Sequence, residues 1–145
     1  MAYDVERIAE KILAKASSSD YEDLISNLKL QKLLYYMQGF HLAYFDKPLF
    51  ADEMEAWMYG PVVPKVYEKY KDHGTAGIEF EGEVIQLEPK EEALFNEVYR
   101  VYGTYSAIGL MNLTHSEMPW KITPTGVGRI IDKENLRTFF KKRLK

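Results

Sequence analysis

Apolar residues recur at three- and four-residue steps in two stretches near the start of the chain. From Val5 to Ala16 this spacing predicts a helix that begins at about Asp4 and ends at the serine- and aspartate-rich stretch 17–20. A longer helix, of about residues 27–45, follows with either Ser26 or Asn27 as its cap. Its length and apolar character suggest that it is the central helix of the fold.

The predicted helix of about residues 27–45 has two apolar faces. A wheel drawn at 100° per residue assigns one broad face to the core, and its members are Leu30, Leu33, Leu34, Met37, Phe40, His41 and Tyr44. On the other side Leu28, Tyr35 and Leu42 stand seven residues apart beside Lys32, and Gly39 permits a close approach of another backbone. Either another helix of the same chain or a partner protein must cover this second stripe.

The rest of the chain alternates short extended segments with helices. Residues 54–59 read as a short strand that ends at Gly60-Pro61, and residues 78–87 read as two strands reversing around Glu81-Gly82. Helices are predicted to begin at Pro64, at about Lys90 with Gly103 as the stop, at Thr104 or Ser106 with an end near His115, and after the cap Asp132. Residues 116–128 read as a loop anchored by Trp120.

These elements predict a single domain over residues 1–145 of the α+β class, mainly α. We expect a compact helical body around the helix of about residues 27–45, with a small two- to three-stranded antiparallel sheet. An apolar fraction of 46% and a charged fraction of 28% are typical of a globular protein. No apolar run reaches the 18 residues that a membrane span needs, so we expect a cytoplasmic protein without membrane contact.

Charge is distributed unevenly along the chain. The net charge is -3, yet residues 129–145 hold seven basic and two acidic side chains. A basic run at the end of a chain is typical of a solvated helix end, where cations interact favourably with the helix dipole. We therefore do not expect nucleic acid to be the partner.

The sequence contains no recognisable catalytic or cofactor motif. The absence of cysteine excludes disulfides, thiolate metal sites and thiol nucleophiles. His41, His73 and His115 are too far apart for a local metal motif, and His41 on an apolar helix face is typical of a hydrogen-bonded core residue. We expect no cofactor, no metal and no enzymatic activity. A hydrolase or nuclease that uses His115 with nearby carboxylates is the enzymatic alternative.

Three strings of the sequence together carry a family resemblance. They are LKLQKLLYY at 28–36, EAWMYGPVVPKVY at 55–67 and LTHSEMPW at 113–120. With these strings the chain resembles, over roughly residues 5–140, the Panacea domain of the SocA-like antitoxins, a family of phage-associated proteins. The resemblance implies a small, mainly helical domain, often carried on prophages, that neutralises a toxin encoded beside it by direct binding. It also implies an AAA+ protease as a further partner, because the family's namesake resembles a proteolytic adaptor.

The resemblance transfers no catalytic residue. By position, the family pattern falls on Lys32, Leu33, Tyr35, Trp57, Tyr59, Gly60, Pro61, Val62, Thr114, His115 and Trp120. Several have structural interpretations: Gly60-Pro61 fixes a strand-to-helix turn, Trp120 pins a loop, and Thr114-His115 satisfies carbonyls at a helix end. Gly109 departs from the pattern, since relatives commonly have an acidic residue there.

The leading hypothesis is therefore an antitoxin-like protein that covers a toxin with apolar and aromatic side chains. The predicted partner contacts are Leu28, Lys32, Tyr35, Leu42, Trp57 and Tyr59. A homodimer is compatible with the sequence. A phage-encoded anti-defence protein that binds a host immunity component is the alternative binding function.

Overall fold

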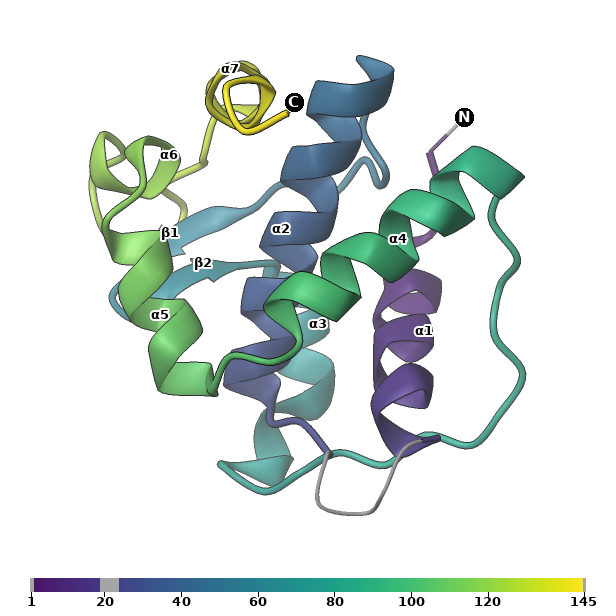
Figure 1. The fold of residues 1–145 in the computed structure, drawn as a ribbon. Helices are drawn as coiled ribbons and strands as arrows, with labels where there is room; N and C mark the ends of the chain where they lie inside the picture. Colours follow the sequence, from purple (N-terminus) through teal and green to yellow (C-terminus); the bar gives the residue numbers. More distant parts are fainter. Residues whose placement is uncertain (1, 19–23, 145) are drawn as a thin grey trace.

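The computed structural model describes residues 2–18 and 24–144 of the chain. Figure 1 shows a mainly helical body with one small two-stranded sheet. The elements are α1 (Val5–Ser17), α2 (Asn27–Phe45), β1 (Glu55–Trp57), β2 (Gly60–Val62), α3 (Pro64–Tyr70), the 3-10 turn η2 (Lys71–His73), α4 (Pro89–Tyr102), α5 (Ala107–His115), α6 (Met118–Lys121) and α7 (Lys133–Lys141). This arrangement confirms the predicted α+β, mainly α class.

The central helix α2 begins and ends where its local sequence dictates. The Ser26 hydroxyl accepts a hydrogen bond from the Lys29 amide at 3.3 Å, so Ser26 is the cap. At the other end Asp46 adopts a left-handed conformation and donates its amide to the Leu42 carbonyl. Helices α1, α4, α5 and α7 and strand β2 all pack against α2 (Figure 1), which confirms its central position.

Helix α7 covers the second apolar stripe of α2 at Tyr35 and Gly39, whereas Leu28 lies beyond this contact and lines a pocket. The Phe140 ring lies 5.5 Å from the Tyr35 ring and 4.7 Å from the Phe40 ring, and it packs directly on Gly39. The sequence hypothesis that Tyr35 and Leu42 contact a partner is thus corrected, because both are buried within this chain. The predicted core face is corrected at Tyr44, which is exposed.

The small sheet is an antiparallel hairpin of β1 and β2. Glu55 pairs with Val62 and Trp57 with Gly60, so the chain reverses at residues 58–59. Gly60-Pro61 therefore does not end the extended structure, as the sequence suggested, but starts its second strand. Backbone from 126 to 131 follows the outer edge of β1, where the Ala56 amide donates to the Arg129 carbonyl at 2.9 Å.

Residues 78–87 do not form the predicted pair of strands. Among the described residues, the segment forms one isolated β-bridge, between Ile78 and Ile25. The rest of the segment has no regular secondary structure and runs along α1. The Phe80 amide donates to the Ser17 hydroxyl and the Lys11 ammonium donates to the Ile85 carbonyl. Side chains of α1 thus supply the hydrogen bonds that a second strand would have supplied. The predicted loop 116–128 likewise contains one helical turn, α6.

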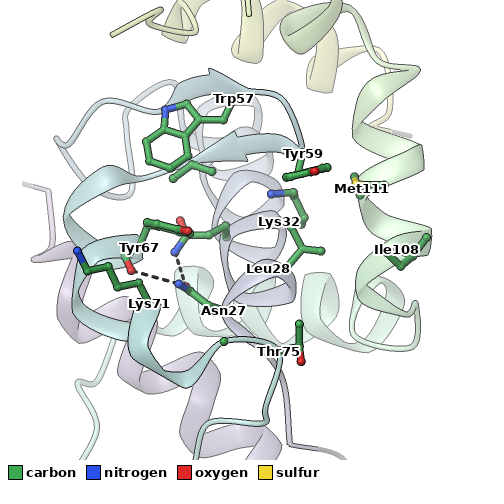
Figure 2. Close-up of a pocket in the computed structure, with 13 residues that line it drawn as sticks. Asn27, Leu28, Lys32, Trp57, Tyr59, Tyr67, Lys71, Thr75, Ile108 and Met111 are labelled. Atoms are coloured by element: carbon green, nitrogen blue, oxygen red, sulfur yellow. Dashed lines mark hydrogen bonds between the residues drawn. The ribbon is translucent and has the colours of Figure 1, made fainter. Parts of the chain in front are cut away.

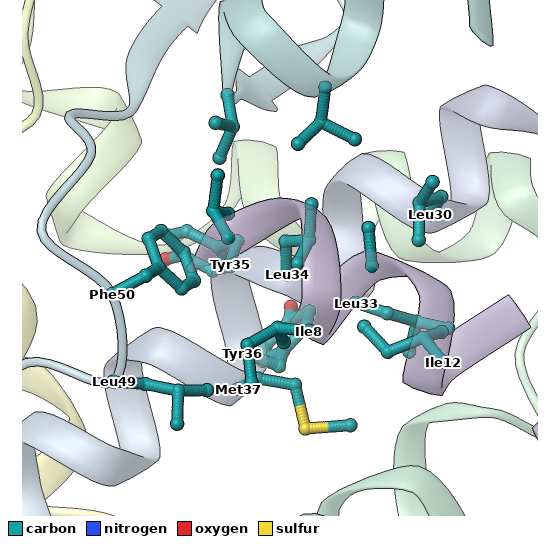
Figure 3. Packing of buried hydrophobic residues seen from close by; sticks show 14 of the residues in the cluster. Ile8, Ile12, Leu30, Leu33, Leu34, Tyr35, Tyr36, Met37, Leu49 and Phe50 are labelled. Carbon is teal, nitrogen blue, oxygen red and sulfur yellow. The ribbon is translucent and has the colours of Figure 1, made fainter. Parts of the chain in front are cut away.

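Figure 3 shows the packing of buried hydrophobic side chains in the core. The structure also contains two buried polar clusters. The Glu117 carboxylate accepts hydrogen bonds from the Tyr35 and Tyr36 hydroxyls at 2.9 and 3.0 Å and forms an ion pair with Arg143. His41 lies between the Glu91 carboxylate, at 2.6 Å, and the Lys47 carbonyl, at 2.7 Å. The prediction that His41 is a hydrogen-bonded core residue is confirmed.

Candidate functional site

A pocket of about 440 Å³ opens between the first half of α2, the β1–β2 hairpin, α3 and α5 (Figure 2). We call it the hairpin pocket. Its lining side chains are mostly apolar or aromatic. The described lining residues are Asn27, Leu28, Gln31, Lys32, Trp57, Tyr59, Val62, Tyr67, Lys71, Gly74, Thr75, Ile108 and Met111.

A buried amide network holds the rear wall of the pocket in place. The Asn27 side chain donates to the Tyr67 carbonyl at 3.1 Å and accepts from the Gln31 side chain at 2.9 Å. The side-chain oxygen of Gln31, Oε1, accepts in turn a hydrogen bond from the Val63 main-chain amide at 2.9 Å. These bonds join α2 to α3 and to its N-cap residue Val63, so these two walls of the pocket are fixed relative to each other.

Lys32 places a positive charge behind the wall of the hairpin pocket. Its side chain has no exposed surface, and its ammonium donates one hydrogen bond, to the Pro61 carbonyl at 3.0 Å. No carboxylate of the described residues forms an ion pair with it. Burial lowers the pKa of Lys32 to about 7, because the charged form loses its hydration. Near neutral pH this group therefore gains or loses a proton readily.

Gly60 allows the hairpin to lie directly over Lys32 and Thr114. Its φ of 110° is one that residues with a side chain rarely adopt. A Cβ built there would come within 2.5 Å of the Lys32 Cε and 3.0 Å of the Thr114 hydroxyl. The Thr114 hydroxyl itself donates to the Met111 carbonyl, in agreement with its predicted role at the end of α5.

Two tryptophans join the hairpin to its neighbours. The Trp57 ring packs edge-on against Tyr67 with the ring centroids 5.0 Å apart, and its indole N–H donates to the Glu55 carboxylate. The Trp120 indole donates to the Trp57 carbonyl at 2.9 Å and stacks on His115 with the ring centroids 4.1 Å apart. Trp120 thus anchors α6 to the hairpin, as the sequence suggested. The Nε2 atom of His115 is buried and has no hydrogen-bond partner among the residues that the structure describes.

The mouth of the hairpin pocket exposes large apolar side chains. Tyr59, in the hairpin, is 62% exposed, and Ile108, on α5, is 57% exposed (Figure 2). Met58, the neighbour of Tyr59 in the hairpin turn, is also mostly exposed. Exposed apolar groups around a concave, partly aromatic site are typical of a surface that meets another macromolecule.

The structure brings together part of the residue set that the sequence proposed. Leu28, Lys32, Trp57, Tyr59 and Val62 all line the hairpin pocket. Leu33, Tyr35 and Leu42 lie in the core, and Gly60 and Pro61 are part of strand β2. Thr114, His115 and Trp120 lie behind the hairpin.

Sequence reasoning missed the lining residues that α3 and α5 contribute, Tyr67, Ile108 and Met111. A usable signal was present at α5, because the string AIGLMNL is apolar around most of the helix.

Charges near the C-terminus are largely paired with acidic residues elsewhere in the chain. Lys133 pairs with Glu53, and both Arg137 and Lys141 pair with Asp46. The basic segment 129–145 therefore contributes to holding α7 against the end of α2 and the loop between α2 and β1. Within residues 2–18 and 24–144, no group of three or more His, Asp and Glu residues is arranged to hold a metal ion. In the same residues, no helix is long and apolar enough to cross a membrane.

Comparison with known proteins assigns the family. The model of the antitoxin SocA-like, Panacea domain matches residues 30–121, which run from the first turn of α2 to the end of α6 and include every described lining residue of the hairpin pocket except Asn27 and Leu28. Antitoxin SocA of Caulobacter vibrioides (strain NA1000 / CB15N) is 33% identical over 150 residues, an alignment that covers 90% of this chain and 79% of the relative. No solved structure matches the chain. The chain belongs to the SocA-like Panacea-domain family of antitoxins.

Proposed function

We propose that this protein is an antitoxin that neutralises a cognate toxin by direct binding, and that the toxin docks over the hairpin pocket. The observation that carries the proposal is an apolar pocket with exposed aromatic and aliphatic side chains at its mouth, in a chain whose curated relative is named an antitoxin. Neutralisation by occlusion needs a rigid surface with apolar anchors and no catalytic group.

Two features support the docking position. The amide network of Asn27 and Gln31 fixes the α2 and α3 walls of the pocket. Binding of a partner would therefore lose little conformational entropy by ordering these walls. The anchors Tyr59 and Ile108 lie on different elements, and both extend away from the core. A partner that fills the pocket therefore contacts the hairpin and α5 together.

Co-expression with the product of the adjacent open reading frame, followed by pull-down, tests this function. We expect the wild-type protein to restore growth of cells that express the toxin and to co-purify with it. Tyr59→Glu and Ile108→Glu should abolish both effects while changing the melting temperature little, because both side chains are mostly exposed. Val127→Glu is the matched control, since Val127 is 82% exposed and lies outside the pocket.

Other functions give different results in the same experiment. A proteolytic adaptor would lower the steady-state amount of the toxin, and this loss would require an active AAA+ protease. An anti-defence protein would leave the neighbouring gene product unbound and would protect an infecting phage. Full neutralisation by both pocket variants would refute the proposed docking position. A hydrolase or nuclease would lose substrate turnover in His115→Ala.

A further inference from the structure

The hairpin pocket combines an apolar lining with an unbalanced positive charge. Of its described lining residues, two are lysines and none is acidic, although the chain as a whole carries a net charge of -3. Lys71 at the rim is already paired with Glu68 at 2.9 Å, and both side chains are largely exposed. Lys32 is different, because its buried ammonium has a single neutral acceptor, the Pro61 carbonyl.

A buried ammonium without a counter-ion is costly to the folded protein. An ammonium group has three donors, and the described residues satisfy one of those on Lys32. Burial of such a charge is normally compensated by a carboxylate within a few ångströms. Lys32 lines the hairpin pocket (Figure 2), so a ligand in the pocket could supply that carboxylate.

We propose that the hairpin pocket receives the carboxylate of an aspartate or glutamate side chain of the bound toxin, with Lys32 as its counter-ion. This inference rests on the proposed antitoxin function and adds the chemistry of the contact. Apolar atoms next to the carboxylate would lie against Leu28 and Trp57, and the anion would approach Lys32 beneath the hairpin turn.

The hairpin turn controls access to Lys32. Tyr59 and Lys32 both line the hairpin pocket (Figure 2), and Gly60, the neighbour of Tyr59, packs on the Lys32 side chain. Because Tyr59 is mostly exposed, its ring can rotate away without losing core packing. Entry of a carboxylate therefore requires a small displacement of residues 58–60, and the amide signals of Tyr59 and Gly60 should report it.

A small-molecule probe tests the pocket without the toxin. We would titrate the protein with 3-phenylpropionate and, separately, with its neutral amide 3-phenylpropionamide, and follow amide chemical shifts by NMR. The carboxylate is expected to bind at least about tenfold more tightly than the amide, with shifts at Tyr59, Gly60 and Ile108. Lys32→Met should equalise the two affinities, while Lys121→Met, at an exposed lysine outside the pocket, should preserve the preference. Equal affinities in the wild-type protein, or shifts outside the pocket, would overturn the proposal.

The toxin complex provides the second arm. Lys32→Met should weaken toxin binding by about thirtyfold to several thousandfold, the range expected when a buried charge pair loses one partner. Lys121→Met, at an exposed lysine outside the pocket, should have little effect. Unchanged binding by Lys32→Met would overturn this inference and leave the proposed function intact. Failure of the wild-type protein to bind the toxin would contradict the proposed function, and the probe titration would still test the pocket. Dependence on the toxin's terminal carboxylate would refute the side-chain assignment.

Discussion

Replacement of Lys32 by methionine should change how the stability of the protein depends on pH. The lysine is buried and its pKa lies at about 7, against 10.5 for an exposed lysine. At pH values between these two pKa values, Lys32 binds its proton more tightly in the unfolded chain than in the folded protein. The free energy of unfolding of the wild-type protein therefore gains a contribution from Lys32 as the pH rises through this window. Methionine has a similar length and no proton to lose, so the variant lacks that gain.

The size of the effect follows from the two pKa values. One pKa unit corresponds to about 1.4 kcal/mol, so the full interval is worth about 5 kcal/mol. An experiment between pH 7 and pH 9.5 covers most of the interval, and we expect a change of about 3 kcal/mol. The buried Tyr35 and Tyr36 also have raised pKa values, mainly through burial. They lower stability at alkaline pH in both proteins and cancel in the comparison.

Urea unfolding of the wild-type protein and Lys32→Met at pH 7, 8 and 9.5 measures this difference. The free energy of unfolding of the wild-type protein relative to the variant should increase steadily over that range. Lys121→Met, at an exposed lysine, should follow the wild-type profile. A difference between wild type and Lys32→Met that stays constant with pH would refute the assignment of Lys32 as a buried, readily deprotonated amine.

Three further substitutions test the packing that positions the pocket, each by chemical denaturation. Gly39→Ala should destabilise the protein by about 1–3 kcal/mol, despite alanine's higher helix propensity, because its Cβ would overlap the buried Phe140 ring. A neutral or stabilising effect would contradict the close contact of α7 with α2. Glu117→Ala should cost about 3–5 kcal/mol, since it leaves the Tyr35 and Tyr36 hydroxyls unpaired, and a loss below 1 kcal/mol would show that the cluster is not coupled. Ser106→Ala should cost about 1 kcal/mol by removing the cap of α5, and an unchanged midpoint would argue against that cap.

Helix boundaries could be predicted from the sequence because their determinants are local. Asp132 is the cap that the sequence predicted, and the helix that was expected to begin at about Asp4 has Asp4 as its cap. Of the alternatives Ser26 or Asn27 and Thr104 or Ser106, the structure selects Ser26 and Ser106. The extended segment 78–87 was misassigned for the complementary reason. Alternation of apolar and polar residues predicts a strand only where a partner strand is present. Here the side chains of Lys11 and Ser17 form the hydrogen bonds that a partner strand would form.

The candidate site was only partly predictable. Leu28, Trp57 and Tyr59 were identified from two sequence strings, and the structure places all three at the hairpin pocket. Tyr35 belonged to the same stripe as Leu28, yet α7 covers it from a hundred residues away along the chain. Ile108 enters the site through the packing of α5 on α2 and β2. Such long-range packing leaves no periodic signal in the segment that it covers.

Hydrogen–deuterium exchange of the protein with and without the co-purified toxin tests the central claim most directly. If the toxin docks over the hairpin pocket, exchange should slow in the complex at residues 57–62 and 104–111, and α4 should be unaffected. Slower exchange confined to α4 and the segment 78–88, with residues 57–62 and 104–111 unchanged, would contradict the claim that this pocket is the binding surface.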